Sequence, residues 1–176
     1  MKLDFGHAAS LMGIYDWEAP VVLGLAPWQT ADELREELAN FRETPIFPRY
    51  SVPALLQWGT VTGSPVGDVC GRVSGFGNRW ANCSMFLPPD TIILAREKTR
   101  YDTAPQMPFD AARAFHILSC FPEVARVVVA VMDKEGDIVS YAIDRDEVLI
   151  QMVCDAVNAF WREVQEARRA TSMEAK

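Results

Sequence analysis

The sequence predicts one domain of mixed α/β (α+β) architecture, in which helices flank a central mixed sheet. Three observations support this fold class. The length of 176 residues suits a single core, and 49% of the residues are hydrophobic, which is enough to fill it. The periodic segments follow in the order helix, irregular strands, helix, hairpin, helix. We therefore expect residues 1–176 to fold as one domain, with a small, polar tail at 167–176 that frays.

The first clear element is a helix that begins near Thr30. This threonine can cap the helix, and Glu33 three residues later completes a capping box. Leu34, Leu38 and Phe41 then recur on one face of the helix. Two prolines follow soon afterwards, and because proline cannot continue a helix, the sequence predicts that it ends before them.

The middle of the chain alternates short elements with turns. A second short helix is expected over residues 51–58, with Pro53 in its first turn. Residues 59–89 are rich in Gly, Pro, Ser and Asn, which predicts turns and short, irregular strands. The β-branched run at residues 91–95 predicts a regular strand. Residues 109–121 then carry apolar side chains at helical spacing.

The last third of the chain carries the strongest patterns. Residues 124–132 form a continuous apolar run, as expected of a central strand. The turn-forming segment 133–137 separates this run from a second strand at 138–143, so the two predict an antiparallel hairpin. From residue 146 to 169 apolar side chains recur every three or four positions, which predicts a long amphipathic helix.

The net charge bears on the partners that the chain can have. At −7, its average field repels nucleic acid, whereas proteins that hold duplex DNA by its phosphates use a basic surface. DNA binding would therefore need a local basic patch. The alternative is that a protein partner recognises the acidic surface itself.

Two further observations bear on location. No uncharged apolar run approaches the roughly 18 residues of a membrane-spanning helix, and the first ten residues lack the features of a secretory signal. The cysteines are scattered without a CxxC pair, so we interpret them as free thiols rather than as disulfides or zinc ligands. These patterns favour a cytoplasmic protein without a membrane partner, and they leave its oligomeric state open. The cysteines are Cys70, Cys83, Cys120 and Cys154.

Three stretches of the chain, taken together, carry a resemblance to a known family. Residues 22–34 read VLGLAPWQTADEL, an apolar run and a tryptophan-containing turn before the capped helix; residues 58–60 read Trp-Gly-Thr; residues 124–164 hold the hairpin and a final helix with Phe-Trp. In order and spacing they resemble the YqaJ-like phage recombinase nucleases, relatives of lambda exonuclease with the PD-(D/E)XK fold. The resemblance implies a restriction-endonuclease-like core.

The resemblance also implies where a metal site would lie. In this fold class an Asp and the Glu of a Glu-x-Lys step hold Mg²⁺, which activates water for phosphodiester hydrolysis. Asp90 takes the position of that Asp, as a metal ligand, and Lys98 that of the lysine. Arg96, however, stands at the glutamate position. The neighbouring Glu97 points to the opposite face of a regular strand, and only a bulge would bring it back.

Other positions also depart from the family pattern. Residues 61–65 offer no acid after the Trp-Gly-Thr step, and residues 8–15 lack the arginine expected to contact a 5′-phosphate. Ala114 and His116 stand where glutamines would face the site. We interpret His116, with Cys120 one turn later, as a packed residue rather than a zinc ligand. The chain is therefore predicted to be a degenerate member of the family.

Three functions are compatible with these patterns. The first is a phage or mobile-element pseudo-nuclease that binds DNA ends, or recombination and defence proteins, without cutting; Arg96, Lys98 and Arg100 are its candidate DNA contacts. The second is an acidic inhibitor of a host nuclease complex, acting as an anti-defence or immunity protein. Neither needs a cofactor. The third is a residual Mg²⁺-dependent deoxyribonuclease with a rearranged catalytic site of Asp90, Glu97 and Lys98.

Overall fold

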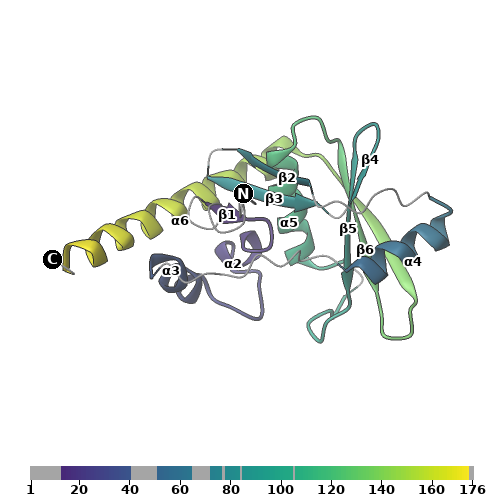
Figure 1. The fold of residues 1–176 in the computed structure, drawn as a ribbon, viewed down its shortest axis with the longest axis horizontal. Helices are drawn as coiled ribbons and strands as arrows, with labels where there is room; N and C mark the ends of the chain where they lie inside the picture. The colour runs from purple at the N-terminus through teal and green to yellow at the C-terminus, as the bar shows by residue number, and fades with distance from the viewer. Residues whose placement is uncertain are drawn as a thin grey trace, which may run out of the picture.

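The computed structural model of the chain describes residues 13–40, 51–64, 72–76, 78–83, 85–104 and 106–174. Within these ranges the elements follow the order β1, α2 (Ala19–Val22), α3, α4, β2, β3, β4, β5, α5, β6, β7, α6 (Figure 1). Their strands form two separate sheets. None of the described helices is long and apolar enough to span a membrane.

The central sheet has four strands in the order β4-β5-β6-β7. Strands β5 and β6 are parallel because helix α5 crosses between them, whereas β4 pairs with β5, and β6 with β7, in antiparallel fashion. The predicted mixed sheet and the predicted C-terminal hairpin are therefore confirmed. The elements are β4 (Met85–Leu87), β5 (Thr91–Glu97), α5 (Pro108–Cys120), β6 (Arg126–Met132) and β7 (Ile138–Asp144).

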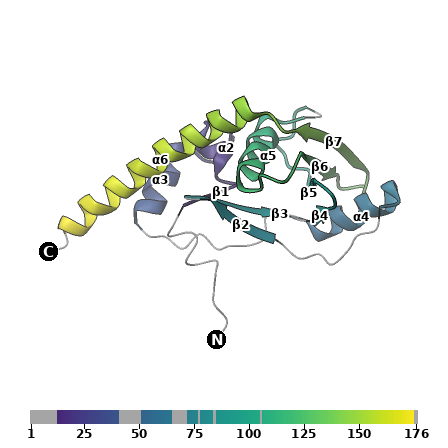
Figure 2. The ribbon, with the colours of Figure 1, turned by 90° about the horizontal axis from the view of Figure 1, so that it is seen from above.

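Helices cover both faces of this sheet (Figure 2). Helices α5 and α6 (Glu147–Glu174) share one core with Ile92 and Leu94, while α4 (Val52–Thr62) packs on Ile93 and Ala95. Successive side chains of a strand point to opposite faces, so β5 supplies both cores in turn. This is why the segment TIILA is apolar throughout rather than alternating.

The second sheet was not predicted. Its three strands, in the order β1-β3-β2, include two from the glycine-rich stretch that was expected to be irregular. Gly13 allows β1 to approach β3: a Cβ at this position would lie 2.0 Å from the carbonyl oxygen of Asn78, which accepts the N–H of Ile14 at 2.8 Å. The strands are β1 (Ile14–Tyr15), β2 (Arg72–Phe76) and β3 (Arg79–Cys83).

Helix α3 (Ala31–Ala39) begins as predicted. The Thr30 side chain accepts the Glu33 N–H, and the Glu33 carboxylate accepts the Thr30 N–H at 2.8 Å, so the capping box is confirmed. The hydrogen bonds that the Glu33 carboxylate accepts from the N–H and the hydroxyl of Thr30 lower the pKa of Glu33. Leu34 and Leu38 are buried, while Phe41 lies outside the described residues.

Two helices are longer than predicted. Helix α4 continues through the Trp-Gly-Thr step to Thr62, where Gly63 at φ 67° ends it, so the expected turns at 59–62 were wrong. Helix α6 continues through the expected tail to Glu174. Its C-terminal half extends beyond the sheet alongside α3 (Figure 1), where Arg35 pairs with Glu163 at 2.5 Å. Within the expected tail, the Arg168 guanidinium donates to the carbonyl oxygen of Leu38 at 2.9 Å, which ties the start of that segment to α3.

The histidine and cysteine predictions agree with the described residues. His116 is fully buried on α5, and Cys120 and Cys154 are buried free thiols. Burial raises the pKa of Cys120 to about 12, so its thiol stays protonated and unreactive. Cys70 lies outside the described residues.

Candidate functional site

Arg96, near the end of β5, is the centre of a buried charge network. Its guanidinium donates to both carboxylate oxygens of Asp110, at 2.8 and 2.5 Å, and to both of Asp102, at 3.0 and 2.7 Å. The Asp110 side chain is fully buried and that of Asp102 is 4% exposed. The hydroxyl of Tyr141, on β7, donates a further hydrogen bond to Asp110 at 2.7 Å.

The fold brings these groups together from separate segments. Arg96 alternates with Ile92 and Leu94 along β5, so it points toward the α5 face of the sheet. Asp110 lies in the first turn of α5, where the helix dipole favours an anion. Asp102 lies in the loop between β5 and α5. Its carboxylate accepts hydrogen bonds from the N–H and the hydroxyl of Thr99, which fix this loop.

Within this network the hydrogen bonds between side chains favour the charged forms of Arg96 and Asp102. Burial disfavours the charged form of Arg96, but the hydrogen bonds to Asp110 and Asp102 raise its pKa above the ordinary value. Burial also opposes ionisation of Asp102, but the hydrogen bonds from Arg96 and Thr99 lower its pKa. Burial and the neighbouring Asp110 raise the pKa of Tyr141, which therefore remains a proton donor.

Acid is expected to weaken this network. Because the pKa of Asp102 is lower in the folded than in the unfolded protein, ionised Asp102 contributes stability above about pH 4, and this contribution is lost as pH falls through the folded-state pKa. Urea titrations of the wild type and Asp102→Asn should therefore differ most near neutral pH and converge in acid. An equal difference across that range would contradict the assignment.

Glu97 belongs to the opposite face of the sheet. Its carboxylate accepts a hydrogen bond at 3.0 Å from the hydroxyl of Ser51, the N-cap residue of α4. Strand β5 keeps an unbroken register with β6 from Thr91 to Glu97, so no bulge turns Glu97 toward Arg96. Lys98 follows directly, exposed, with its N–H bonded to the carbonyl oxygen of Met132 at 2.7 Å.

Asp90 lies at the other end of β5. It belongs to the turn between β4 and β5, and its carbonyl oxygen accepts the N–H of Ala125 at 2.8 Å. At about 3.3 Å per strand residue, its backbone is roughly 20 Å from that of Glu97. The structure therefore does not bring Asp90 together with Glu97 and Lys98, the three residues predicted to form a catalytic metal site.

The groups around Arg96 do not fit a Mg²⁺ ion. A magnesium site needs oxygen ligands around an open position, whereas here the guanidinium of Arg96 already binds both Asp102 and Asp110. Across the part of the chain that the structure describes, no three Asp, Glu, His or Cys side chains gather as the ligands of a metal ion would. The carboxylates of this site therefore serve an internal ion pair.

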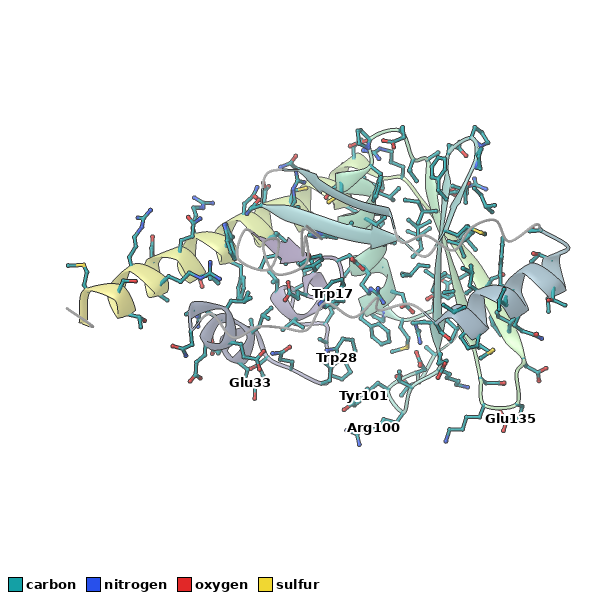
Figure 3. The ribbon with its side chains drawn as sticks, viewed as in Figure 1. Trp17, Trp28, Glu33, Arg100, Tyr101 and Glu135 are labelled. Carbon is teal, nitrogen blue, oxygen red and sulfur yellow. The ribbon has the colours of Figure 1, made fainter. Side chains whose placement is uncertain are left out.

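The predicted DNA contacts differ in their availability. Arg96 is 11% exposed and engaged with two aspartates, so it does not present its charge to a phosphate, contrary to the prediction. Lys98 and Arg100 are exposed. The Arg100 guanidinium lies over the ring of Tyr101, 4.8 Å from its centroid, and donates to the Tyr101 hydroxyl at 2.6 Å (Figure 3).

A pocket of about 340 Å³ opens beside Arg96, and sequence reasoning missed it. Trp28 is part of its lining. The centroid of the Trp28 ring lies 5.3 Å from that of Phe109 and 6.0 Å from that of Tyr101, and Figure 3 shows Trp28 beside Tyr101. We call this space the aromatic pocket. Its lining comprises the aromatic residues Trp17, Trp28, Tyr101 and Phe109, the charged residues Glu18, Glu37, Arg96, Glu97 and Arg113, and Val21, Gln29, Leu34 and Thr99.

A second buried ion pair supports the wall of the aromatic pocket. The Arg113 guanidinium on α5 donates to the carboxylate of Asp16 at 2.9 Å, and the Asp16 side chain is fully buried. Asp16 directly follows β1 and precedes Trp17, whose ring lies near that wall. The pair thus holds the β1 segment against α5. Trp28, in the turn before α3, is the residue of the sequence that could have indicated this pocket.

Comparison with known proteins identifies the fold. No protein-family model and no curated protein matches the chain. Among solved structures, it is similar to the alkaline exonuclease LHK-Exo from Laribacter hongkongensis, with a TM-score of 0.71 and 15% identity over 98% of this chain and 97% of that one. The structure of LHK-Exo in complex with dAMP gives a TM-score of 0.68 at 14% identity, with the same coverage.

A phage-related exonuclease from Haemophilus somnus 129PT is also similar. Its TM-score is 0.67 at 11% identity, over 92% of this chain and 96% of that one. At these identities the likeness establishes the fold, and the nuclease fold implied by the sequence resemblance is confirmed. The residues that act in this chain must be argued from its own site.

Proposed function

We propose that this chain, which has the fold of phage-related exonucleases, binds a partner without cutting DNA. The single observation that carries the proposal is the position of Arg96. On the sequence resemblance it stands where a glutamate would ligate Mg²⁺, and its guanidinium is held by Asp102 and Asp110 in a buried ion-pair network. A fixed positive charge at that place opposes the binding of a metal cation.

A cleavage assay tests the loss of catalysis. Purified protein is incubated with end-labelled duplex and single-stranded DNA, with and without Mg²⁺, and the products are separated on a gel. We expect no Mg²⁺-dependent product. Mg²⁺-dependent cleavage that disappears in Asp90→Ala would overturn the proposal and would show that Asp90 belongs to an active site.

DNA is the first candidate partner, through the loop that follows β5. Lys98 and Arg100 are exposed there, within three residues of each other. If they hold phosphates, duplex binding should need no Mg²⁺ and should weaken steeply with salt. Arg100→Glu should then reduce retention in a gel-shift assay at low salt, whereas Arg169→Glu, an exposed charge reversal on the far end of α6, should reduce it much less. Equal losses would indicate only the change in net charge.

A protein is the second candidate partner, in line with an acidic inhibitor of a nuclease or defence complex. Two observations favour it: the net charge of −7 and the acidic side chains of α3 beside the aromatic pocket. Under this function the isolated protein neither cuts nor retains DNA in the assays above. The acidic surface would instead pair with a basic surface of the partner.

A further inference from the structure

The aromatic pocket has a surplus of negative charge. Two arginines line it, but Arg96 and Arg113 are each held by buried aspartates. Glu18 and Glu37 line the pocket as well, whereas the Glu97 carboxylate lies on the other face of the sheet with Ser51. Together with Asp16, Asp102 and Asp110, the aspartate partners of the arginines, this makes five carboxylates against two guanidinium groups, a formal surplus of three negative charges. Such a pocket repels a phosphate and attracts a cation.

The rings of the pocket favour the same kind of ligand. Two of them already lie beneath guanidinium groups: Arg96 is 5.1 Å from the ring centroid of Phe109, and Arg100 is 4.8 Å from that of Tyr101. Trp28 meets its neighbours edge-on or tilted, and its side chain remains 43% exposed. Tryptophan is the aromatic side chain that binds cations best, and arginine stacks on it more often than lysine.

A buried donor in the lining indicates that the ligand also carries an acceptor. Trp17 is 8% exposed, and its indole N–H is buried without a hydrogen-bond partner among the described residues. An unsatisfied buried donor costs about 1–3 kcal/mol, so a ligand that supplies an oxygen atom gains by binding near it. A free cation offers no such atom, whereas the carbonyl groups of a peptide do.

We propose that the aromatic pocket binds an arginine side chain presented by a protein partner. The guanidinium stacks on Trp28 and pairs with Glu37, which is half-buried and accepts a hydrogen bond from Gln29 at 3.1 Å. The volume of about 340 Å³ lies at the lower end of the range for ligand pockets, roughly 300–1,000 Å³, and so suits one side chain. This inference rests on the proposed function, since it names the partner of a chain that binds without cutting.

Calorimetric titration of the full chain tests the inference. The probe is the peptide acetyl-Gly-Arg-Gly-amide, and its counterpart carries citrulline, which keeps the shape of arginine without the charge. We expect saturable binding with a Kd of roughly 1 mM or lower, at least tenfold weaker for the citrulline peptide. Trp28→Ala and Glu37→Gln should each weaken binding several-fold, while Glu166→Gln, an exposed residue on α6, should leave it unchanged. Circular dichroism verifies that each variant is folded.

Three outcomes would overturn the inference. They are absence of binding by the arginine peptide, equal affinity for both peptides, and equal loss in the Glu37→Gln and Glu166→Gln variants. Binding of dAMP at the same site would also overturn it, because a nucleotide would then fill the pocket. Its failure is distinguishable from that of the proposed function, since DNA cleavage is measured separately and does not depend on the peptide.

Discussion

Replacing Arg96 with methionine is expected to lower the free energy of unfolding by about 3–5 kcal/mol, because it leaves the buried carboxylates of Asp102 and Asp110 without their cation. Methionine keeps the long, unbranched shape, so the loss reports charge rather than packing. The Tyr141 hydroxyl still donates to Asp110 at 2.7 Å and offsets a small part of it. Urea denaturation at neutral pH measures the change.

Two comparisons make this result specific. Arg126→Met removes a surface ion pair with Asp144, whose side chains are 50% and 71% exposed, and should cost no more than about 1 kcal/mol. The double variant Arg96→Met/Asp110→Asn should recover part of the loss, since it removes one of the uncompensated charges. If Arg96→Met costs no more than Arg126→Met, the buried network does not stabilise the fold.

Arg113→Met should have a comparably large effect, about 3–5 kcal/mol, for the same physical reason. The carboxylate of Asp16, fully buried, loses the guanidinium that donates to it at 2.9 Å. Unlike Arg96, Arg113 joins segments far apart in sequence, so its loss should loosen the β1 segment and the Trp17 wall of the aromatic pocket. Thermal denaturation followed by tryptophan fluorescence measures both the stability and the change near Trp17.

The matched variant for this prediction is Arg113→Met/Asp16→Asn. Asparagine fills the same space without the charge, so the double variant should be more stable than Arg113→Met alone. A double variant as unstable as the single one would mean that the Arg113 side chain acts through its packing on α5. The arginine-peptide titration on the same proteins would then report whether the pocket still forms.

The sequence by itself determined several elements of this protein. The capping box at Thr30, the apolar run of β6, the turn of the C-terminal hairpin and the periodicity of α6 are local patterns, and the structure contains each of them. The arginine at position 96 was also visible without coordinates. It was therefore possible to expect that the acidic metal constellation implied by the resemblance is incomplete.

Only the tertiary structure decided which charged side chains pair with one another. Arg113 and Asp16 are 97 positions apart, and Tyr141 is 31 positions from Asp110, so no local pattern signals that they meet. The aromatic pocket likewise arises where α2, α3, α5 and the end of β5 pack together. Side-chain period and capping act within a few residues of the chain, whereas ion pairs, pockets and the pairing of short strands depend on how distant segments are packed. This is why the long helices and the C-terminal hairpin were predictable, while the second sheet and the site were not.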